Sequence, residues 1–227
     1  MFWNKVGPMW KYWMTLCLPL LLCGCAPDLW KDVPEFEVMD FTCPVKGSKF
    51  LEDDNYVSGW SVLGPLKPGN DLSIHAELLP EEGLLNGNRR APRGTTWFRV
   101  HVDRSDDEAL CGQISFGPKF ENHRNGGRRS VFYACATLKC PQDHEGLVMH
   151  LVALGKIKVW INGKAVYASE RGSGSMKAEP VLVRDLSLVK GCNRLVVKYM
   201  DDGDGPSRGR VFSLRFTDAA GNLSTVR

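Results

Sequence analysis

The feature that most constrains the fold of this chain is a hairpin pattern at residues 157–167. Apolar residues alternate with others from Ile157 to Ile161, Asn162-Gly163 follows, and a second run ends at Tyr167. Asn-Gly between two such runs predicts a two-residue β-turn, because both central residues of a type I′ turn need positive φ. We expect the two sets of side chains to lie on opposite faces of a sheet: Ile157, Val159 and Ile161 on one, Lys158 and Trp160 on the other.

Short β patterns continue through the rest of the chain from Tyr56 onward. The other predicted strands cover residues 57–63, 95–102, 110–116, 130–138, 147–151, 181–183, 195–199 and 211–216, with a short one after Gly221-Asn222. Gly and Pro turns separate them, and no stretch of the mature chain shows sustained helical periodicity. The pattern predicts an all-β fold, a single β-sandwich of the jelly-roll kind.

Residues 1–24 have the composition of a secretory signal. Lys5 and Lys11 supply positive charge, and an apolar stretch then runs from Trp13 to Cys23. That stretch is about ten residues long, whereas a membrane-spanning helix needs about 20. We therefore expect residues 1–24 to be a signal peptide that is removed.

The residues at the end of this signal, Leu22-Cys23-Gly24-Cys25, resemble the lipobox of bacterial lipoproteins. The resemblance implies that Cys25 carries the lipid and becomes the first residue of the mature chain. Two or more acyl chains, as such lipoproteins carry, hold a protein stably on a membrane. By resemblance to Gram-negative sorting, Ala26 favours the outer membrane. The alternative is an ordinary signal cleaved nearby, which would leave Cys25 as a plain thiol.

Removal of the signal leaves 203 of the 227 residues, and we expect two parts. Residues 25–55 form a partly ordered tether with several prolines, and residues 56–227 form the sandwich. Loss of Lys5 and Lys11 lowers the formal net charge from +3 to +1, which gives no case for nucleic-acid binding. A local arginine cluster is predicted to be a solvated loop, with an anion-binding patch as the alternative: Arg124, Arg128 and Arg129.

Five cysteines remain once the signal is removed and Cys25 is lipidated: Cys43, Cys111, Cys135, Cys140 and Cys192. Exported proteins can form disulfides, but an odd number leaves at least one thiol unpaired within the chain. If Cys135 and Cys140 lie on one strand, they are too far apart for a disulfide. No CxxC motif occurs, which gives no support to a thioredoxin or a zinc ribbon. The sequence does not decide the pairing of the others.

Several motifs, taken in order, resemble those of galactose-binding-like domains, which are common in exported proteins of Planctomycetes, Verrucomicrobia and their relatives. The matching segments are Trp60-Ser61-Val62-Leu63-Gly64-Pro65, Phe132-Tyr133-Ala134, Val159-Trp160-Ile161-Asn162-Gly163-Lys164, residues 188–198 and Phe212-Ser213-Leu214-Arg215-Phe216-Thr217-Asp218. The resemblance covers residues 56–220 and implies a carbohydrate-binding-type β-sandwich. Leu66 replaces the usual Phe, and Leu154-Gly155-Lys156 replaces an acidic loop, which weakens any ligand or calcium role for that loop.

No catalytic set is found in the sequence. The histidines His75, His101, His123, His144 and His150 are scattered without a metal-ligand spacing. Gly172-Ser173-Gly174-Ser175 lacks the spacing of a nucleophile elbow. The acidic pairs, including Glu81-Glu82, are predicted to lie in loops, and no two carboxylates can be placed together across a glycan. We expect no cofactor.

Two further groups of residues bear on ligand binding. Asp201-Asp202-Gly203-Asp204-Gly205 offers carboxylates to calcium but lacks the EF-hand spacing, so an acidic hairpin loop is the favoured interpretation. The aromatic residues with the right chemistry for a sugar platform are Trp60, Trp97, Trp160, Tyr133 and Tyr167. All lie on predicted strands, where burial is the rule, and Trp160 is predicted to pack on a sheet face.

The sequence thus predicts a lipid-anchored, exported protein that binds a glycan or a partner protein through a non-catalytic module. The first alternative is a structural accessory subunit of an envelope complex that binds no small ligand. The second is a glycan-active enzyme with dispersed carboxylates. No ligand-binding residue is assigned, and Cys25 is the one predicted site.

Overall fold

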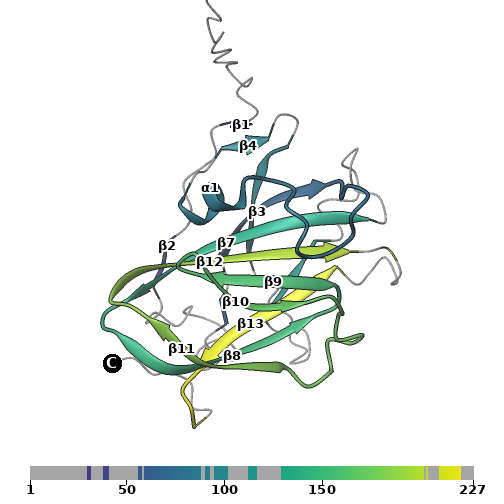
Figure 1. Cartoon of the computed structure of the whole chain (residues 1–227). Coiled ribbons are helices and arrows are strands. Elements are labelled where there is room, and N and C mark those ends of the chain that lie inside the picture. The colour runs from purple at the N-terminus through teal and green to yellow at the C-terminus, as the bar shows by residue number, and fades with distance from the viewer. Residues whose placement is uncertain are drawn as a thin grey trace, which may run out of the picture.

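Two sheets face each other across a hydrophobic core in the computed structural model of the chain (Figure 1). The structure describes residues 30–31, 38–40, 56–57, 59–87, 90–92, 95–101, 112–116, 129–201, 203 and 210–220. The predicted all-β sandwich is confirmed. Within the described residues, no helix is long and apolar enough to span a membrane. Cys25, Cys43, Cys111 and His123 lie outside the described residues, as do residues 1–24 and the cluster Arg124 and Arg128.

The larger sheet has seven strands. Along its main path these are β10 (Lys164–Ser169), β9 (Lys156–Ile161), β12 (Gly191–Asp201), β7 (Ser130–Cys140), β3 (Gly59–Leu66) and β5 (Trp97–His101). Each neighbouring pair on this path is antiparallel. The short strand β2 (Val38–Asp40) pairs with β7 in parallel.

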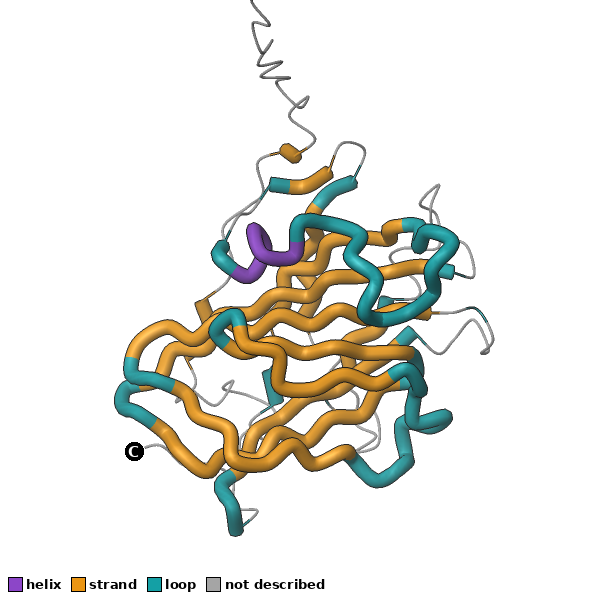
Figure 2. Tube along the Cα trace, in the orientation of Figure 1, coloured by secondary structure: helices purple, strands orange, loops and turns teal. Residues whose placement is uncertain are grey.

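The smaller sheet is antiparallel and has four strands in the order β11 (Val181–Leu188), β8 (His144–Ala153), β13 (Val211–Thr217) and β6 (Gln113–Ser115). A separate two-stranded pair joins β1 (Trp30–Lys31) to β4 (Ala91–Pro92). The helix α1 (Glu81–Leu85) is a single short turn on the side of the larger sheet (Figure 2). The sequence placed Glu81-Glu82 in a loop, and this is wrong: the two residues begin α1.

The main core lies between the two sheets and follows the two-residue alternation of the strands. On β7 the even-numbered residues from Phe132 to Cys140 face it, and on β9 it takes Ile157, Val159 and Ile161, as the hairpin pattern predicted. Aromatic rings fill the centre, where Phe116 and Phe132 stack with their centroids 4.5 Å apart. Cys135 and Cys140 lie on the same strand and form no disulfide, which confirms that they do not pair with each other.

A second core lies on the outer face of the larger sheet. Residues 67–87, which we call the cover segment, run from the end of β3 through α1 and lie across this face (Figures 1 and 2). Their apolar residues Ile74, Leu79 and Leu84 are buried with sheet residues such as Tyr133 and Trp160. Both faces of the larger sheet are therefore buried along its centre.

Hydrogen bonds join two turns that the sequence predicted. Asn162 and Gly163 have φ values of 50° and 81°, as a type I′ turn requires, and Gly191 has a φ of 96°. The Asn162 side-chain amide donates to Asn193 Oδ1 at 2.8 Å, and Asn162 Oδ1 accepts from the Arg194 backbone N–H. Asn193 also bonds both backbone groups of Val189. These motif residues therefore join the β9–β10 turn to the β11–β12 turn.

Replacement of Asn193 by alanine is expected to lower the free energy of unfolding by about 1–3 kcal/mol, because it removes the hydrogen bonds to the Val189 backbone and to Asn162. The Asn193 side chain that makes these bonds is fully buried. Urea denaturation of the variant measures the loss, and Lys190→Ala, at an exposed residue of the same turn, is the matched control. Equal stability of the two variants would contradict this role for Asn193.

Candidate functional site

The most concentrated group of ionisable side chains in the described part of the chain lies under the cover segment. Lys158, Lys198 and Tyr133 are directly opposite one another on the neighbouring strands β9, β12 and β7. The Lys198 side chain has 0% exposure, and that of Lys158 has 17%. Two lysines side by side on a sheet repel each other, and a buried ammonium group needs a counter-charge.

The counter-charge is Glu81, the first residue of α1. Its Oε1 accepts from Lys198 Nζ at 2.8 Å and from the Tyr133 hydroxyl at 2.8 Å. Its Oε2 lies 3.8 Å from Lys158 Nζ. Lys198 Nζ also donates to the backbone oxygen of Ala76. One carboxylate from the cover segment is thus shared by two lysines and a tyrosine of the sheet, and we call this group the Lys198 cluster.

Aromatic rings complete the surroundings of the Lys198 cluster. Lys158 Nζ lies 4.6 Å from the ring centroid of Trp160, which has 4% exposure. Burial, and then the negative charge of Glu81, raises the pKa of Tyr133 far above its usual value. Tyr133 therefore stays protonated and acts as a hydrogen-bond donor.

Other residues fasten the cover segment on either side of the Lys198 cluster. Lys156 Nζ donates to Leu72 O at 2.7 Å, and Arg194 Nη1 donates to Leu85 O at 2.7 Å. Glu170 accepts from the Ser73 hydroxyl at 2.6 Å and forms an ion pair of 3.2 Å with Lys156. Cations of the sheet thus bind the cover segment at several points along its length.

Acidification is expected to weaken the contact at Glu170. The hydrogen bond from Ser73, and to a smaller degree Lys156, hold the pKa of Glu170 below its ordinary value of 4.5. Because the folded-state pKa is the lower one, this carboxylate stabilises the fold above about pH 4.5, and the contribution is lost as the pH falls through the folded-state pKa. The effect is small, since the Glu170 side chain is 43% exposed.

Urea denaturation at a series of pH values below 5 tests this expectation. Glu170→Gln is expected to reduce the loss of stability on acidification, whereas Glu179→Gln, at an exposed residue of the same connection, is expected to leave it unchanged. If the wild-type chain and Glu170→Gln lose stability in parallel, Glu170 is not one of the fastening groups.

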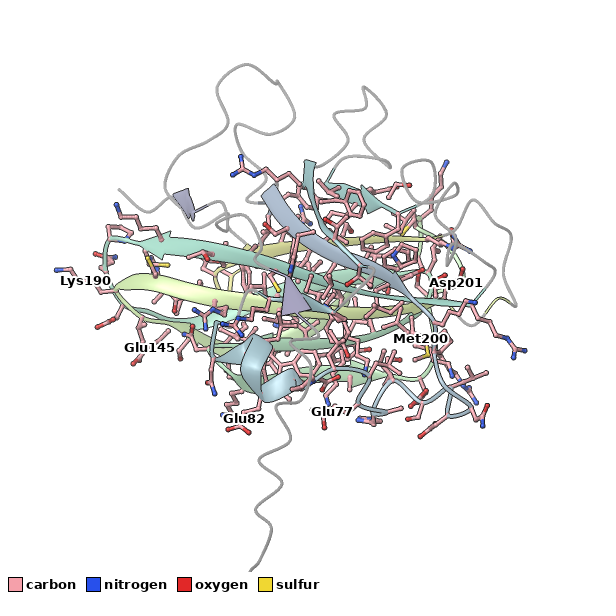
Figure 3. All side chains as sticks on the ribbon, turned by 90° about the horizontal axis from the view of Figure 1, so that it is seen from above. Glu77, Glu82, Glu145, Lys190, Met200 and Asp201 are labelled. Atoms are coloured by element: carbon pink, nitrogen blue, oxygen red, sulfur yellow. The ribbon has the colours of Figure 1, made fainter. Side chains whose placement is uncertain are left out.

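The acidic loop predicted as a possible calcium site is only partly described. Asp201 Oδ2 pairs with Arg210 Nε at 2.5 Å, and its Oδ1 accepts from the Gly203 N–H at 2.9 Å. Both carboxylate oxygens of Asp201 are thus engaged, and Asp202 and Asp204 lie outside the described residues. Figure 3 places Asp201 and Met200 at one end of the molecule and Lys190 and Glu145 at the other. Within the described ranges, no group of three or more His, Cys, Asp or Glu lies together as metal ligands.

The structure buries most of the aromatic residues that the sequence offered as sugar platforms. Trp60, Trp97, Trp160 and Tyr133 have exposures of 0–6%, and Trp160 packs on the sheet face as predicted. Tyr167 on the edge strand β10 is half-buried. Stacking against a sugar needs an open ring face, which the four buried residues do not offer.

The structure shows the surroundings of His75, His150 and the serine loop. His75 is exposed, and His150 shares a 2.8 Å hydrogen bond with Thr217. Burial lowers the pKa of His150, and the positive charges of Arg215 and Arg184 lower it further. Ser173 donates to the backbone oxygens of Ala153 and Ser175, so its hydroxyl serves the loop itself. These outcomes agree with the structural interpretation of both motifs.

The Lys198 cluster was not predicted from the sequence. Lys198 and Glu81 are 117 residues apart, so no local spacing joins them. The one available signal was a lysine inside the apolar run from Leu195 to Met200, which indicates a strand buried on both faces.

By its fold, the chain belongs to the class of all-β sandwiches. No protein-family model and no curated protein matches the chain. Among solved structures, Ruminococcus gnavus β-glucuronidase with D-glucuronic acid has a TM-score of 0.45 and 15% identity over 70% of this chain and 29% of that chain. The same enzyme with D-glucaro 1,5-lactone has a TM-score of 0.42 and 18% identity over 63% and 21%. The chain thus spans less than a third of these enzymes, and at such TM-scores the likeness carries no argument about activity.

Proposed function

We propose that this chain is a lipid-anchored module of the cell envelope that binds a partner protein or a glycan and catalyses no reaction. Cys25 carries the lipid, residues 25–55 link it to the sandwich, and the outer membrane is the expected location. The proposal combines the lipobox resemblance with the way in which the sandwich uses its ionisable side chains.

The observation that carries the non-catalytic part is the state of Glu81. Its oxygens are engaged by Lys198, Tyr133 and Lys158, all from the sheet beneath. A general acid or base needs access to a substrate proton, and a glycosidase needs a second carboxylate across the bond to be cleaved. The Lys198 cluster instead binds one part of the chain to another.

The surface of the described residues favours contact with a protein over stacking on a sugar. Four of the five aromatic candidates are buried, and the exposed large apolar residues, Val181, Leu182 and Val189, lie on or directly after β11. Tyr167 favours a glycan ligand, because this residue is only half-buried at the edge of the sandwich.

The proposal is tested by measuring both binding and product formation with the full lipidated chain in nanodiscs. One arm titrates a broad glycan panel, and the other cross-links the chain in its own membranes and identifies reproducible partners by mass spectrometry. Saturable binding in either arm, with every glycan recovered unchanged, supports the proposal. Absence of binding in both arms, or the appearance of a glycan product, would overturn it.

An accessory subunit that binds no small ligand is the second candidate, and the burial of four of the five candidate sugar-platform residues favours it. It predicts that a stable partner co-purifies with the chain in detergent at a fixed ratio. A chain that leaves the membrane without any partner would remove this candidate and leave the first one standing.

A further inference from the structure

The edge strand β11 gathers the exposed apolar surface of the described residues. Val181 has 40% exposure and Leu182 41%, and Val189, which directly follows the strand, has 52%. Val181 and Val183 lie opposite the core residues Leu151 and Met149, so their side chains are on the core side of the sheet. Apolar residues on the core side that remain exposed indicate an open side of the sandwich.

β11 has one neighbour in the described part of the smaller sheet, which is β8. Among the described strands, none pairs with the backbone groups along its other edge. β10, the corresponding edge of the larger sheet, differs in chemistry, since it presents Lys164, Ala165 and Ala168 as exposed residues. Within the described residues, large exposed apolar side chains gather at β11 and not at β10.

The order of core-side and outward-facing residues in β11 is the same whether the strand is read from its first residue or from its last. Between Val183 and Leu186 the strand has one more residue than β8, a bulge formed by Arg184 and Asp185, and Asp185 has a φ of 57°. The core-side residues lie symmetrically about this bulge: Val181 and Val183 before it, Leu186 and Leu188 after it. The outward-facing residues Leu182 before it and Ser187 after it are both exposed, whereas among the core-side residues Val181 is exposed and Leu186 and Leu188 are buried.

The charges at the centre of β11 are also self-complementary. Arg184 and Asp185 are adjacent, of opposite sign and exposed. In an antiparallel pair of two such strands, centred between these residues, Arg184 of each copy faces Asp185 of the other. Opposite charges placed directly across a strand pair are favourable, and like charges are unfavourable.

We propose that β11 pairs in antiparallel fashion with β11 of a second copy of this chain, about a two-fold axis between Arg184 and Asp185. Val183 then faces Leu186 of the partner, Leu182 faces Ser187, and Val181 faces Leu188. The smaller sheets of the two copies join into one, and the exposed Val181 of each copy lies beside Leu188 of the other. Closed two-fold pairing of identical patches is the commonest symmetry of soluble oligomers.

The bulge determines the register. A bulge in an edge strand ordinarily discourages pairing, because it interrupts the regular backbone. Here it lies at the two-fold axis, so residues 181–183 of one copy pair with residues 186–188 of the other. The register of β11 against β8 shifts once more between Leu186 and Leu188, where β8 has the additional residue. A shift by one residue would place core-side residues opposite outward-facing ones. An unrelated strand would have to supply the same interruption and the same charge order.

The oligomeric state of the full chain in detergent, under reducing conditions, tests the proposal. We expect light scattering to show a dimer. Arg184→Glu is expected to raise the dissociation constant of this dimer about tenfold, because two attractive contacts become repulsive. The double variant R184E/D185K reverses both charges and is expected to recover most of the affinity. Lys164→Glu, the same kind of charge reversal on β10, is the matched control and is expected to change nothing.

A cross-linking variant tests the register without relying on charge. In L182C/S187C the two new thiols of one copy face those of the other, so oxidation is expected to give a covalent dimer, and neither single variant is expected to do so. A monomeric wild-type chain, a dimer insensitive to Arg184→Glu, or equal cross-linking of the single and double variants would each overturn the proposal.

Discussion

Replacement of Glu81 by alanine is expected to lower the free energy of unfolding by about 3–5 kcal/mol, because it leaves a buried ammonium group without its counter-charge. Lys198 has 0% side-chain exposure and would keep the backbone oxygen of Ala76, an uncharged group, as an acceptor of its hydrogen bonds. Lys158, directly opposite Lys198, would also lose the carboxylate that separates the two charges. Urea denaturation, with the slope checked for two-state unfolding, measures the loss.

Two further variants make this result specific. Glu82→Ala removes an exposed carboxylate from the next position of α1 and is expected to change the free energy of unfolding by less than about 0.5 kcal/mol. The double variant E81L/K198M replaces the pair by apolar groups and is expected to lose less stability than Glu81→Ala alone. If Glu81→Ala is as stable as Glu82→Ala, the Lys198 cluster does not hold the cover segment.

Replacement of Cys25 by alanine is expected to abolish lipid attachment, which is the largest effect on location that any single substitution should have. In the proposed anchor, the sulfur atom of Cys25 forms the thioether to diacylglycerol, and an alanine side chain has no atom that can replace it. The measurement is the incorporation of a labelled fatty acid into the chain, followed by the intact mass of the protein from membranes. We expect incorporation to fall to background.

Cys23→Ala is the matched control for this substitution, because it removes the other thiol of the same motif and leaves Cys25 in place. It is expected to be labelled like the wild-type chain. Label on Cys25→Ala, or an unlabelled wild-type chain, would show that Cys25 is a plain thiol and that the membrane attachment must be sought elsewhere.

The strands of the sandwich were predictable because each is specified by local alternation and by its turns. The β9–β10 hairpin has the predicted faces, and its Asn162-Gly163 turn has the predicted positive φ values. The absence of a disulfide between Cys135 and Cys140 follows from their places on one strand. The same motif residues turned out to bind each other through Asn162 and Asn193, which no local pattern could indicate.

The second core was not predictable in the same way. The cover segment is rich in Gly, Pro and Asn, without the periodicity that marks an element packed on a sheet. Its burial depends on contacts with residues far along the chain, such as Glu81 with Lys198 and Ser73 with Glu170. A lysine in a strand is normally at the surface, so the apolar run around Lys198 indicated a strand buried on both faces but not which carboxylate would pair with the lysine.

A search for glycan products is the most direct test of our central claim, which is that the Lys198 cluster fastens the chain to itself and leaves no reaction centre. The full lipidated chain in nanodiscs is incubated with the glycan panel, and every glycan is analysed by mass before and after. We expect all glycans to be recovered unchanged, including any that the chain retains. A product whose formation disappears in Glu81→Gln, with the melting temperature of the variant near that of the wild-type chain, would contradict the claim and make Glu81 a catalytic residue.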